Sequence, residues 1–353
     1  MKIQLVTVVL VITSLSGVLA TDSGKLDTGV VPEQETTKVA PFIFSFFDNS
    51  DPKMNPFAEL TTNFHLTIIS GRVGSVSGLQ VGGFVNHVKY DFTGYDATGI
   101  VSTVKGDFSG FQTTGIYNRV DGSFIGIQDV GIYSFVGSDF LGVQSTGITN
   151  RVEGSFKGIQ VAGISNNTKQ LEGLQIAGIV NSADQVNGVQ IGLVNLSGEL
   201  NGIAIGLVNI SKAGSVHGVG WSGGAMEMNA GVKFAPNDYW YTILSLGRGG
   251  DLTQYEDEAS IGYYMGFRLP LWVPSFFAEL DIGSNSVYNG DLFDDRDWED
   301  KVSSALETRA SLVFQFHKRL SLFVGLAYTR TGDDIGRFSG GETDTSPFFG
   351  IQF

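Results

Sequence analysis

A short sequence is repeated nine or ten times between Val76 and Val216, and this repetition constrains the fold more than any other feature of the chain. The clearest copies begin at Ser155, Leu171 and Val186. The first glycine recurs at a step of 16 residues, which shortens to 15 and 14 and then returns to 16. These glycines are Gly78, Gly94, Gly110, Gly126, Gly142, Gly158, Gly173, Gly188, Gly202 and Gly218. A unit this short cannot bury its own apolar face, so we expect successive copies to stack and share one continuous core.

Apolar residues recur at four fixed places in the repeat, so equivalent side chains are expected to stack in rows. In one copy the four rows are represented by Phe140, Val143, Ile148 and Val152. The row of Phe140 also contains Phe92, Phe108, Phe124 and Phe156, before it changes to smaller apolar residues. We expect this phenylalanine row to lie inside the repeat region.

Amide side chains form two further rows, which predict hydrogen-bonded ladders, since stacked amides can bond from one copy to the next. The glutamine row contains Gln80, Gln112, Gln128, Gln144, Gln160, Gln175 and Gln190. The asparagine row contains Asn86, Asn118, Asn150, Asn166, Asn181, Asn195 and Asn209. Other residues occupy ladder positions at Asp96, Ser102, Ser134 and Ala204, where we expect the ladders to be interrupted.

The stacked rows favour an all-β fold that contains a β-solenoid of 14–16-residue repeats. In this fold we expect the glycines at corners, where they supply positive φ and let neighbouring backbones approach closely. The alternative is one large transmembrane β-barrel, because a strand of about 9–11 residues is enough to cross a bilayer. Neighbouring barrel strands run in opposite directions, so identical successive copies fit a solenoid better.

The first 75 residues divide into three segments by composition. Residues 1–20 contain one early cation, an apolar run and small residues before a cleavage position, which together predict a cleaved signal peptide. Residues 21–40 are polar and show no period, so we expect a disordered leader. Residues 41–75 are more apolar and are expected to form N-terminal strands that open or cap the repeat region at 76–216.

Residues 217–353 alternate between apolar residues and polar or small ones. This alternation predicts seven or eight strands in a small antiparallel β-barrel, with an apolar face toward lipid and a polar face toward the lumen. A soluble β-sandwich with one buried face is the alternative. Aromatic residues near strand ends, such as Trp240 and Trp272, and an alternating aromatic C-terminus that ends at Phe353 favour the membrane barrel.

The segment 64–71 is followed by repeat copies such as 78–86 and 188–195, which share a fairly specific pattern of glycine, glutamine and asparagine, and the transition to the barrel follows around Trp221. In these motifs the chain resembles the leptospiral-type surface-repeat proteins, which are also found in Bacteroidetes. The resemblance covers most of the mature chain and implies a location in the cell envelope or at the cell surface. It implies no activity that can be assigned to individual residues.

Few residues suited to catalysis or metal binding occur in the sequence. The chain has no cysteine, which excludes thiol nucleophiles and thiolate metal sites. Its four histidines, His65, His87, His217 and His317, are widely separated and lack a metal-binding spacing. One acidic segment is a weak candidate for a calcium site, because oxygen ligands suit that ion, although it lacks the spacing of a calcium-binding loop. Its carboxylates are Asp291, Asp294, Asp295, Asp297, Glu299 and Asp300.

These features predict a non-enzymatic protein of the bacterial outer membrane or cell surface, with a structural or adhesive role and no cofactor. An outer-membrane channel is the alternative. A lipid-modifying barrel enzyme is a third hypothesis, which the spacing of serines, histidines and acids does not support. The expected partners are outer-membrane lipid and an extracellular protein or glycan, and the formal charge of −14 argues against nucleic acid.

Overall fold

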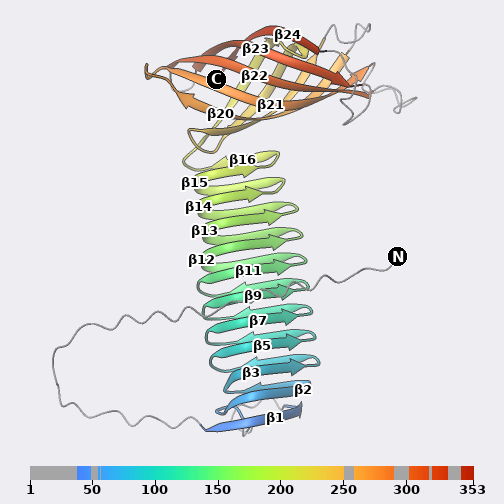
Figure 1. The fold of residues 1–353 in the computed structure, drawn as a ribbon, viewed down its shortest axis with the longest axis vertical. Coiled ribbons are helices and arrows are strands. Elements are labelled where there is room, and N and C mark those ends of the chain that lie inside the picture. The colour runs from blue at the N-terminus through green and yellow to red at the C-terminus, as the bar shows by residue number, and fades with distance from the viewer. Residues whose placement is uncertain are drawn as a thin grey trace, which may run out of the picture. The chain divides into compact units, whose positions relative to one another are not determined.

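The fold is all-β and consists of a parallel β-solenoid of about nine turns followed by a closed eight-stranded antiparallel barrel (Figure 1). The computed structural model describes residues 38–48, 55, 57–249, 258–289, 302–317, 320–332 and 343–353. The predicted solenoid and small barrel are confirmed, and the alternative of one large barrel is not. The signal peptide expected at 1–20 lies outside the described residues, as does the expected leader up to residue 37.

A typical turn of the solenoid contains one longer and one shorter strand, and equivalent strands of successive turns pair in parallel and in register. Gly142, for example, pairs with Gly126 on one side and Gly158 on the other. From β12 onward the shorter strand of one turn continues into the longer strand of the next. The strands are β1 (Val39–Phe47), β2 (Thr61–Val73), β3 (Ser75–Gly82), β4 (Val85–Val88), β5 (Phe92–Thr98), β6 (Val101–Val104), β7 (Phe108–Thr114), β8 (Tyr117–Val120), β9 (Phe124–Val130), β10 (Tyr133–Val136), β11 (Phe140–Thr146), β12 (Thr149–Ala162), β13 (Ser165–Ala177), β14 (Val180–Ile191), β15 (Val194–Ile205) and β16 (Val208–Ser211).

The solenoid core contains two of the four apolar rows. Phe140 is 1% exposed, and its ring stacks on those of Phe124 and Phe156 with centroid separations of 4.7 and 4.9 Å. These separations match the strand spacing of about 4.7–4.9 Å, so in-register pairing of the strands produces the stack of rings. The row of Val152 is also buried, and both rows belong to one core.

The other two apolar rows stack on the outside of the solenoid. Val143 is 38% exposed and Ile148 is 40% exposed. Because side chains alternate between the two faces of a strand, Val143 and Phe140 of the same strand must point in opposite directions. The period therefore predicts correctly that equivalent residues stack, but it does not say on which face each row lies.

Both amide ladders are present in the interior of the solenoid. The amide nitrogen of Gln144 donates to Gln128 Oε1 at 2.7 Å, and its oxygen accepts a hydrogen bond of 2.8 Å from Gln160. The bonds continue through Gln175 to Gln190, each 2.8 Å long. Side-chain bonds of 2.8–3.0 Å link Asn150, Asn166, Asn181, Asn195 and Asn209.

The positions that depart from the repeat interrupt the glutamine ladder at only one end. Asp96 accepts hydrogen bonds of 3.0 Å from the glutamines on both sides, so a carboxylate joins two amides there. Ser102 and Ser134 stand in the asparagine row but bond to side chains of the glutamine row. The asparagine ladder is therefore interrupted at both serines, as expected, and among the described residues Asn118 Oδ1 has no hydrogen-bond partner. The glutamine ladder is interrupted at Ala204, because the side-chain oxygen of Gln190 has no hydrogen-bond partner in the described part of the chain.

We expect Gln144→Ala to lower the free energy of unfolding by about 1–3 kcal/mol, because the buried amide nitrogen of Gln160 loses its acceptor. Urea unfolding of the purified protein measures this loss. Ser145→Ala is the matched control, because Ser145 follows Gln144 in the same strand and takes no part in the ladder. The stability of this variant should stay within about 0.5 kcal/mol of the parent. Equal stability of the two variants would show that the ladder does not stabilise the fold.

The first glycines of the repeat lie within the longer strands, which corrects the expectation that they form corners. Gly142 has a φ of +135°, and a Cβ at this position would lie 1.9 Å from the carbonyl oxygen of Gly126. The positive φ and the close approach of neighbouring backbones are both as expected. Glycine is required here because successive turns lie too close for a side chain.

Eight strands from Ser215 to Gln352 close the barrel. Alternate residues face opposite sides: Leu280 and Ile282 are 58% and 47% exposed on the outside, while Glu279 and Asp281 are buried within. The strands are β17 (Ser215–Gly223), β18 (Met226–Ala235), β19 (Trp240–Arg248), β20 (Glu258–Pro270), β21 (Phe276–Asn289), β22 (Val302–His317), β23 (Leu320–Gly332) and β24 (Thr343–Gln352). The described residues include no helix long and apolar enough to cross a membrane.

Side chains of the barrel cap the last turns of the solenoid. Trp240 Nε1 donates to the carbonyl oxygen of Ala204 at 2.7 Å, and Asn237 Nδ2 donates to that of Gly202 at 2.9 Å. Asn209, the last residue of the asparagine ladder, donates to a hydroxyl of β19 at 2.9 Å. An open strand edge presents unpaired backbone groups, so these contacts satisfy part of the edge that ends the solenoid.

Candidate functional site

The barrel lumen is filled by charged side chains that pair across strands. Arg309 Nε lies 2.7 Å from Asp281 Oδ1, and Lys233 Nζ lies 2.6 Å from Glu279 Oε1. Arg268 Nε also lies 2.7 Å from Glu279 Oε1. The residues come from β18, β20, β21 and β22, so closure of the barrel brings together charges that are far apart in the sequence.

Aromatic rings surround the buried guanidinium of Arg309. Its central carbon lies 3.9 Å from the ring centroid of Tyr264 and 4.7 Å from that of Trp221, which are distances of cation–π contacts. The hydroxyl of Tyr264 donates to Glu307 Oε2 at 2.7 Å. The interior of the barrel is therefore packed with side chains, as is usual for eight strands.

The structure separates the residues that the sequence singled out. The acidic segment from Asp291 to Asp300 lies outside the described residues. The ladder glutamines and asparagines are buried in the solenoid core, where they bond to one another. His65 begins the glutamine ladder, with Nδ1 2.8 Å from Gln80 Oε1. In the described part of the chain, histidines and acids form no group of three or more that could hold a metal ion.

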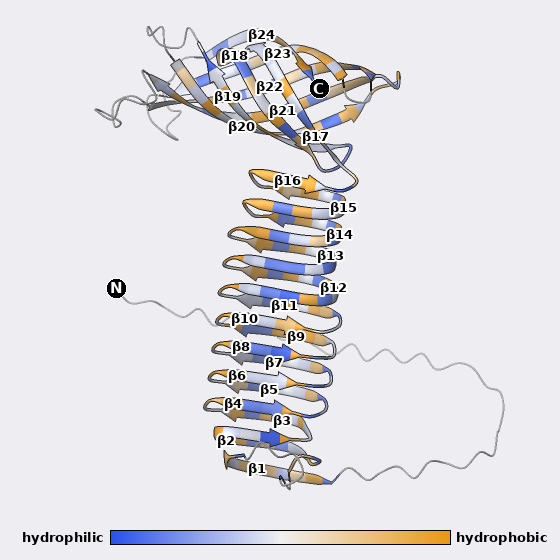
Figure 2. Ribbon diagram, turned by 180° about the vertical axis from the view of Figure 1, so that it is seen from behind, coloured by the Kyte–Doolittle hydropathy of each residue, from blue (hydrophilic) through white to orange (hydrophobic). Residues whose placement is uncertain are grey.

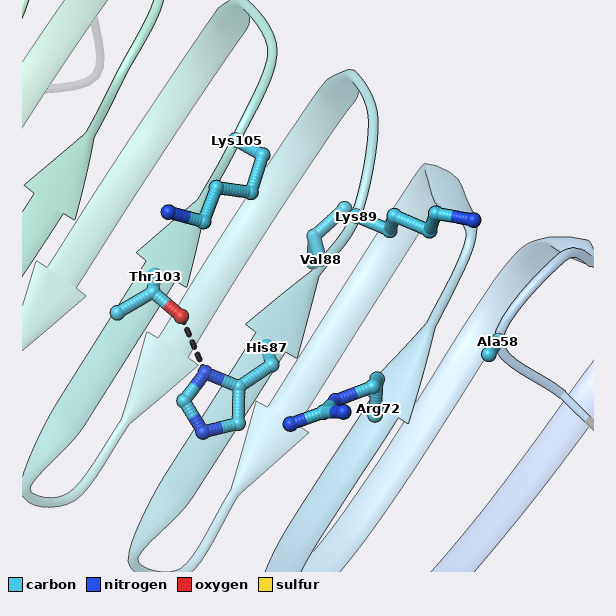
Figure 3. A pocket seen from close by; sticks show the side chains of 7 residues that line it. All are labelled: Ala58, Arg72, His87, Val88, Lys89, Thr103 and Lys105. Atoms are coloured by element: carbon cyan, nitrogen blue, oxygen red, sulfur yellow. Dashed lines mark hydrogen bonds between the residues drawn. The ribbon is translucent and has the colours of Figure 1, made fainter. Parts of the chain in front are cut away.

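A cationic pocket lies on the outer face of the first turns, where Arg72, His87, Lys89 and Lys105 come together around a cavity of about 270 Å³ (Figure 3). In Figure 3 the guanidinium of Arg72 lies beside the imidazole of His87, whose Nδ1 is hydrogen-bonded to the hydroxyl of Thr103. Arg72, His87 and Thr103 are register partners on β2, β4 and β6. Parallel pairing in register therefore places these side chains in one row.

The imidazole of His87 is kept neutral at pH 7 by its surroundings. Burial lowers the pKa of His87, and the positive charges of Arg72 and Lys105 lower it further, while Asp48 acts in the opposite direction. Because the usual pKa of histidine is about 6.5, a lowered value leaves the ring uncharged at neutral pH. The pocket thus combines a permanent guanidinium charge with a ring that gains charge in acid.

Sequence reasoning identified His87 but missed its neighbours, although a signal was present. In later turns an arginine of this row is followed two residues later by an acid: Arg119 bonds Asp121, and Arg151 bonds Glu153. At Arg72 the corresponding position is Gly74. Gly74 therefore cannot supply the acid that pairs with the arginine of this row in later turns.

Two apolar rows are exposed along the solenoid. In Figure 2 hydrophobic segments recur along one edge of the stacked turns. Eight members of the row of Ile148 are 40–51% exposed. These are Phe84, Ile116, Ile132, Ile148, Ile164, Ile179, Leu193 and Leu207. Continuous exposed apolar surface of this kind is common where proteins bind a partner.

The fold defines a two-part protein, a β-solenoid joined to a small antiparallel barrel. No protein-family model and no curated protein matches the sequence. Among solved structures, the solution structure of outer membrane protein H (OprH) from P. aeruginosa in DHPC micelles is similar to 40% of this chain and 99% of its own, with 13% identity and a TM-score of 0.29. The N-terminal β-barrel domain of Pseudomonas aeruginosa OprF is similar to 39% of this chain and 95% of its own, with 13% identity and a TM-score of 0.26.

Proposed function

We propose that this chain is a non-enzymatic outer-membrane protein in which the barrel is a membrane anchor and the solenoid is a structural scaffold that binds a partner. The observation that carries the proposal is the division of the barrel into an apolar outside and a charged inside. Residues such as Leu246, Leu269 and Leu326, which are 59–65% exposed, would be costly to leave in water and are suited to lipid contact. The buried ion pairs lie on the opposite face of the same strands.

The packed lumen supports an anchor over a channel. A conducting pore needs a continuous water path, whereas Lys233, Glu279, Arg309 and Asp281 pair across the middle of this barrel. Eight-stranded barrels have interiors just wide enough for side chains to fill. The solenoid, which the channel hypothesis would have used as additional barrel strands, forms a separate parallel structure.

Loop lengths support a periplasmic position for the solenoid, in contrast to the surface display expected from the sequence. Three residues separate β17 from the end of β16, so the solenoid joins the barrel at the end where the connections 236–239, 271–275 and 318–319 are short. At the other end the β17–β18 turn at 224–225 is short, but the connections 249–257, 290–301 and 333–342 are long. In outer-membrane barrels the short turns face the periplasm and the long loops face outward.

Single-cysteine labelling tests both the membrane location and this orientation, because the parent chain has no cysteine. We expect Asp295→Cys, in the long connection between β21 and β22, to react with a membrane-impermeant maleimide on intact cells. Ser109→Cys, at an exposed position of β7, should react only after the outer membrane is permeabilised. The cysteine-free parent is the control for background labelling.

Two outcomes would contradict the proposal. Equal labelling of Ser109→Cys in intact and permeabilised cells would place the solenoid at the cell surface, and would favour the adhesive role expected from the sequence. Recovery of the full-length protein in the soluble fraction, rather than with the outer membrane, would show that the barrel is not a membrane anchor.

A further inference from the structure

We propose that the cationic pocket on the first turns of the solenoid is a binding site for a small oxyanion, a phosphate or a carboxylate group. This inference rests on the solenoid alone, so it does not depend on the orientation proposed above. It goes beyond a general scaffold role because it names a site and the chemistry of its ligand.

The first observation is that Arg72 lacks the partner that other arginines of its row have. Arg119 and Arg151 bond to acids two residues later at 2.5 and 2.6 Å. The side chain of Arg72 makes no hydrogen bond or ion pair with any described residue, although its own backbone oxygen accepts a bond of 3.0 Å from Asn55. A guanidinium presents several donors in a planar fork that matches the oxygens of a phosphate or carboxylate.

The second observation is that cations replace the acids of the neighbouring row. Lys89 and Lys105 come two residues after His87 and Thr103. The equivalent position of the next turn is occupied by an acid, Asp121. Lys89 and Lys105 thus add two cations to the lining of a pocket that also contains Arg72, in a chain with a formal charge of −14. These positive charges would attract an anion.

The lysines are available to an incoming anion. Lys89 bonds Glu59, and Lys105 lies 2.8 Å from Asp121, but their side chains are 43% and 63% exposed. Exposed ion pairs of this kind contribute little to stability, so exchange of partner costs little. The pocket therefore offers Arg72 as a donor, together with two lysines that can turn toward the ligand.

The size of the pocket suits a small group. Its volume of about 270 Å³ lies below the range of roughly 300–1,000 Å³ that is usual for drug-sized ligands. A phosphate or a carboxylate fits, either free or as the terminal group of a larger molecule. The shared requirement is an oxyanion that can accept bonds from Arg72 and from the imidazole of His87.

Titration calorimetry of the full-length protein in detergent micelles tests the site, with inorganic phosphate in one arm and acetate in the other. We expect saturable binding to the parent at pH 6, and affinity at least about tenfold weaker in Arg72→Gln, because this variant loses charge-assisted hydrogen bonds to the anion. Arg151→Gln, which removes an acid-paired arginine of the same row, should bind like the parent. Binding of phosphate alone identifies a phosphate site, and binding of both anions identifies a site that also accepts carboxylates.

A second measurement uses the imidazole signals of His87 in NMR spectra across pH. A bound anion favours the charged ring, so phosphate should raise the pKa of His87, and binding should tighten as pH falls through that pKa. Arg72, Lys105 and Asp48 act on this ring electrostatically, and Thr103 is hydrogen-bonded to it. Because the charge of Arg72 lowers the pKa of His87, Arg72→Gln should itself raise that pKa. The same variant should abolish the response of the pKa to phosphate. The proposal is overturned if neither anion binds the parent, or if Arg72→Gln binds as tightly as Arg151→Gln does.

Discussion

Phe140→Ala is expected to lower the free energy of unfolding by about 3–5 kcal/mol, the usual cost of truncating a buried phenylalanine. The side chain is 1% exposed and lies between two stacked rings, so truncation opens a cavity between turns and removes two stacking contacts. Leu141→Ala is the matched control, because the adjacent side chain of the same strand is 46% exposed and should cost much less.

Hydrogen exchange would show how far the damage from Phe140→Ala spreads. Solenoid stability is carried by contacts between neighbouring turns, so exchange should rise from about Gly110 to Gly173 while the barrel amides stay protected. Urea unfolding gives the total loss. A variant as stable as Leu141→Ala, with unchanged exchange on both sides of residue 140, would show that the phenylalanine row does not hold the turns together.

Arg309→Met is expected to destabilise the barrel by a similar amount, about 3–5 kcal/mol, because it leaves Asp281 buried without its cation. Both side chains are almost fully buried, at 3% and 5% exposure, and the guanidinium also contacts the ring of Tyr264. Unfolding by urea in detergent micelles, followed by the loss of the compact barrel on unheated gels, measures the effect.

The double variant Arg309→Met with Asp281→Leu is the control that isolates the unpaired charge. Replacing both partners by apolar residues removes the buried carboxylate, so this variant should be more stable than Arg309→Met alone. The solenoid should be unaffected in both variants, since its turns are stabilised by their own neighbours. If the double variant is no more stable than the single one, water in the lumen already solvates Asp281 and the ion pair contributes little.

Much of the architecture could be predicted from the sequence because its causes are local and repeated. The 16-residue step requires equivalent residues to stack, and this placed Phe140 beside Phe124 and Gln144 beside Gln128. Alternation placed Glu279 and Asp281 on the polar face of a barrel strand. Both inferences follow from strand geometry, in which a residue's position along the chain decides the direction of its side chain.

Other features depend on contacts that no local pattern contains. Alternation assigns Lys233 and Glu279 to the lumen, but only the registers of four antiparallel strands bring them within 2.6 Å. The repeat glycines are a second example. Their period is visible in the sequence, whereas their location within the strands depends on how closely the backbones of successive turns approach. Asp96 looked like an interruption of the glutamine ladder, yet a carboxylate continues that ladder because it accepts from the amides on both sides. Ser134 does interrupt the asparagine ladder, since its hydroxyl bonds to the glutamine row instead.

The sequence by itself therefore determined a stacked repeat, an alternating C-terminal barrel and the identity of the buried ladders, since each depends on periodicity. Only the tertiary structure decided which apolar rows are exposed, which charges pair in the lumen, and that Arg72 lies beside His87. The physical reason is that periodicity fixes the relation between equivalent residues of successive turns. Burial and charge pairing depend instead on what lies across the core, across the barrel or at the end of the stack.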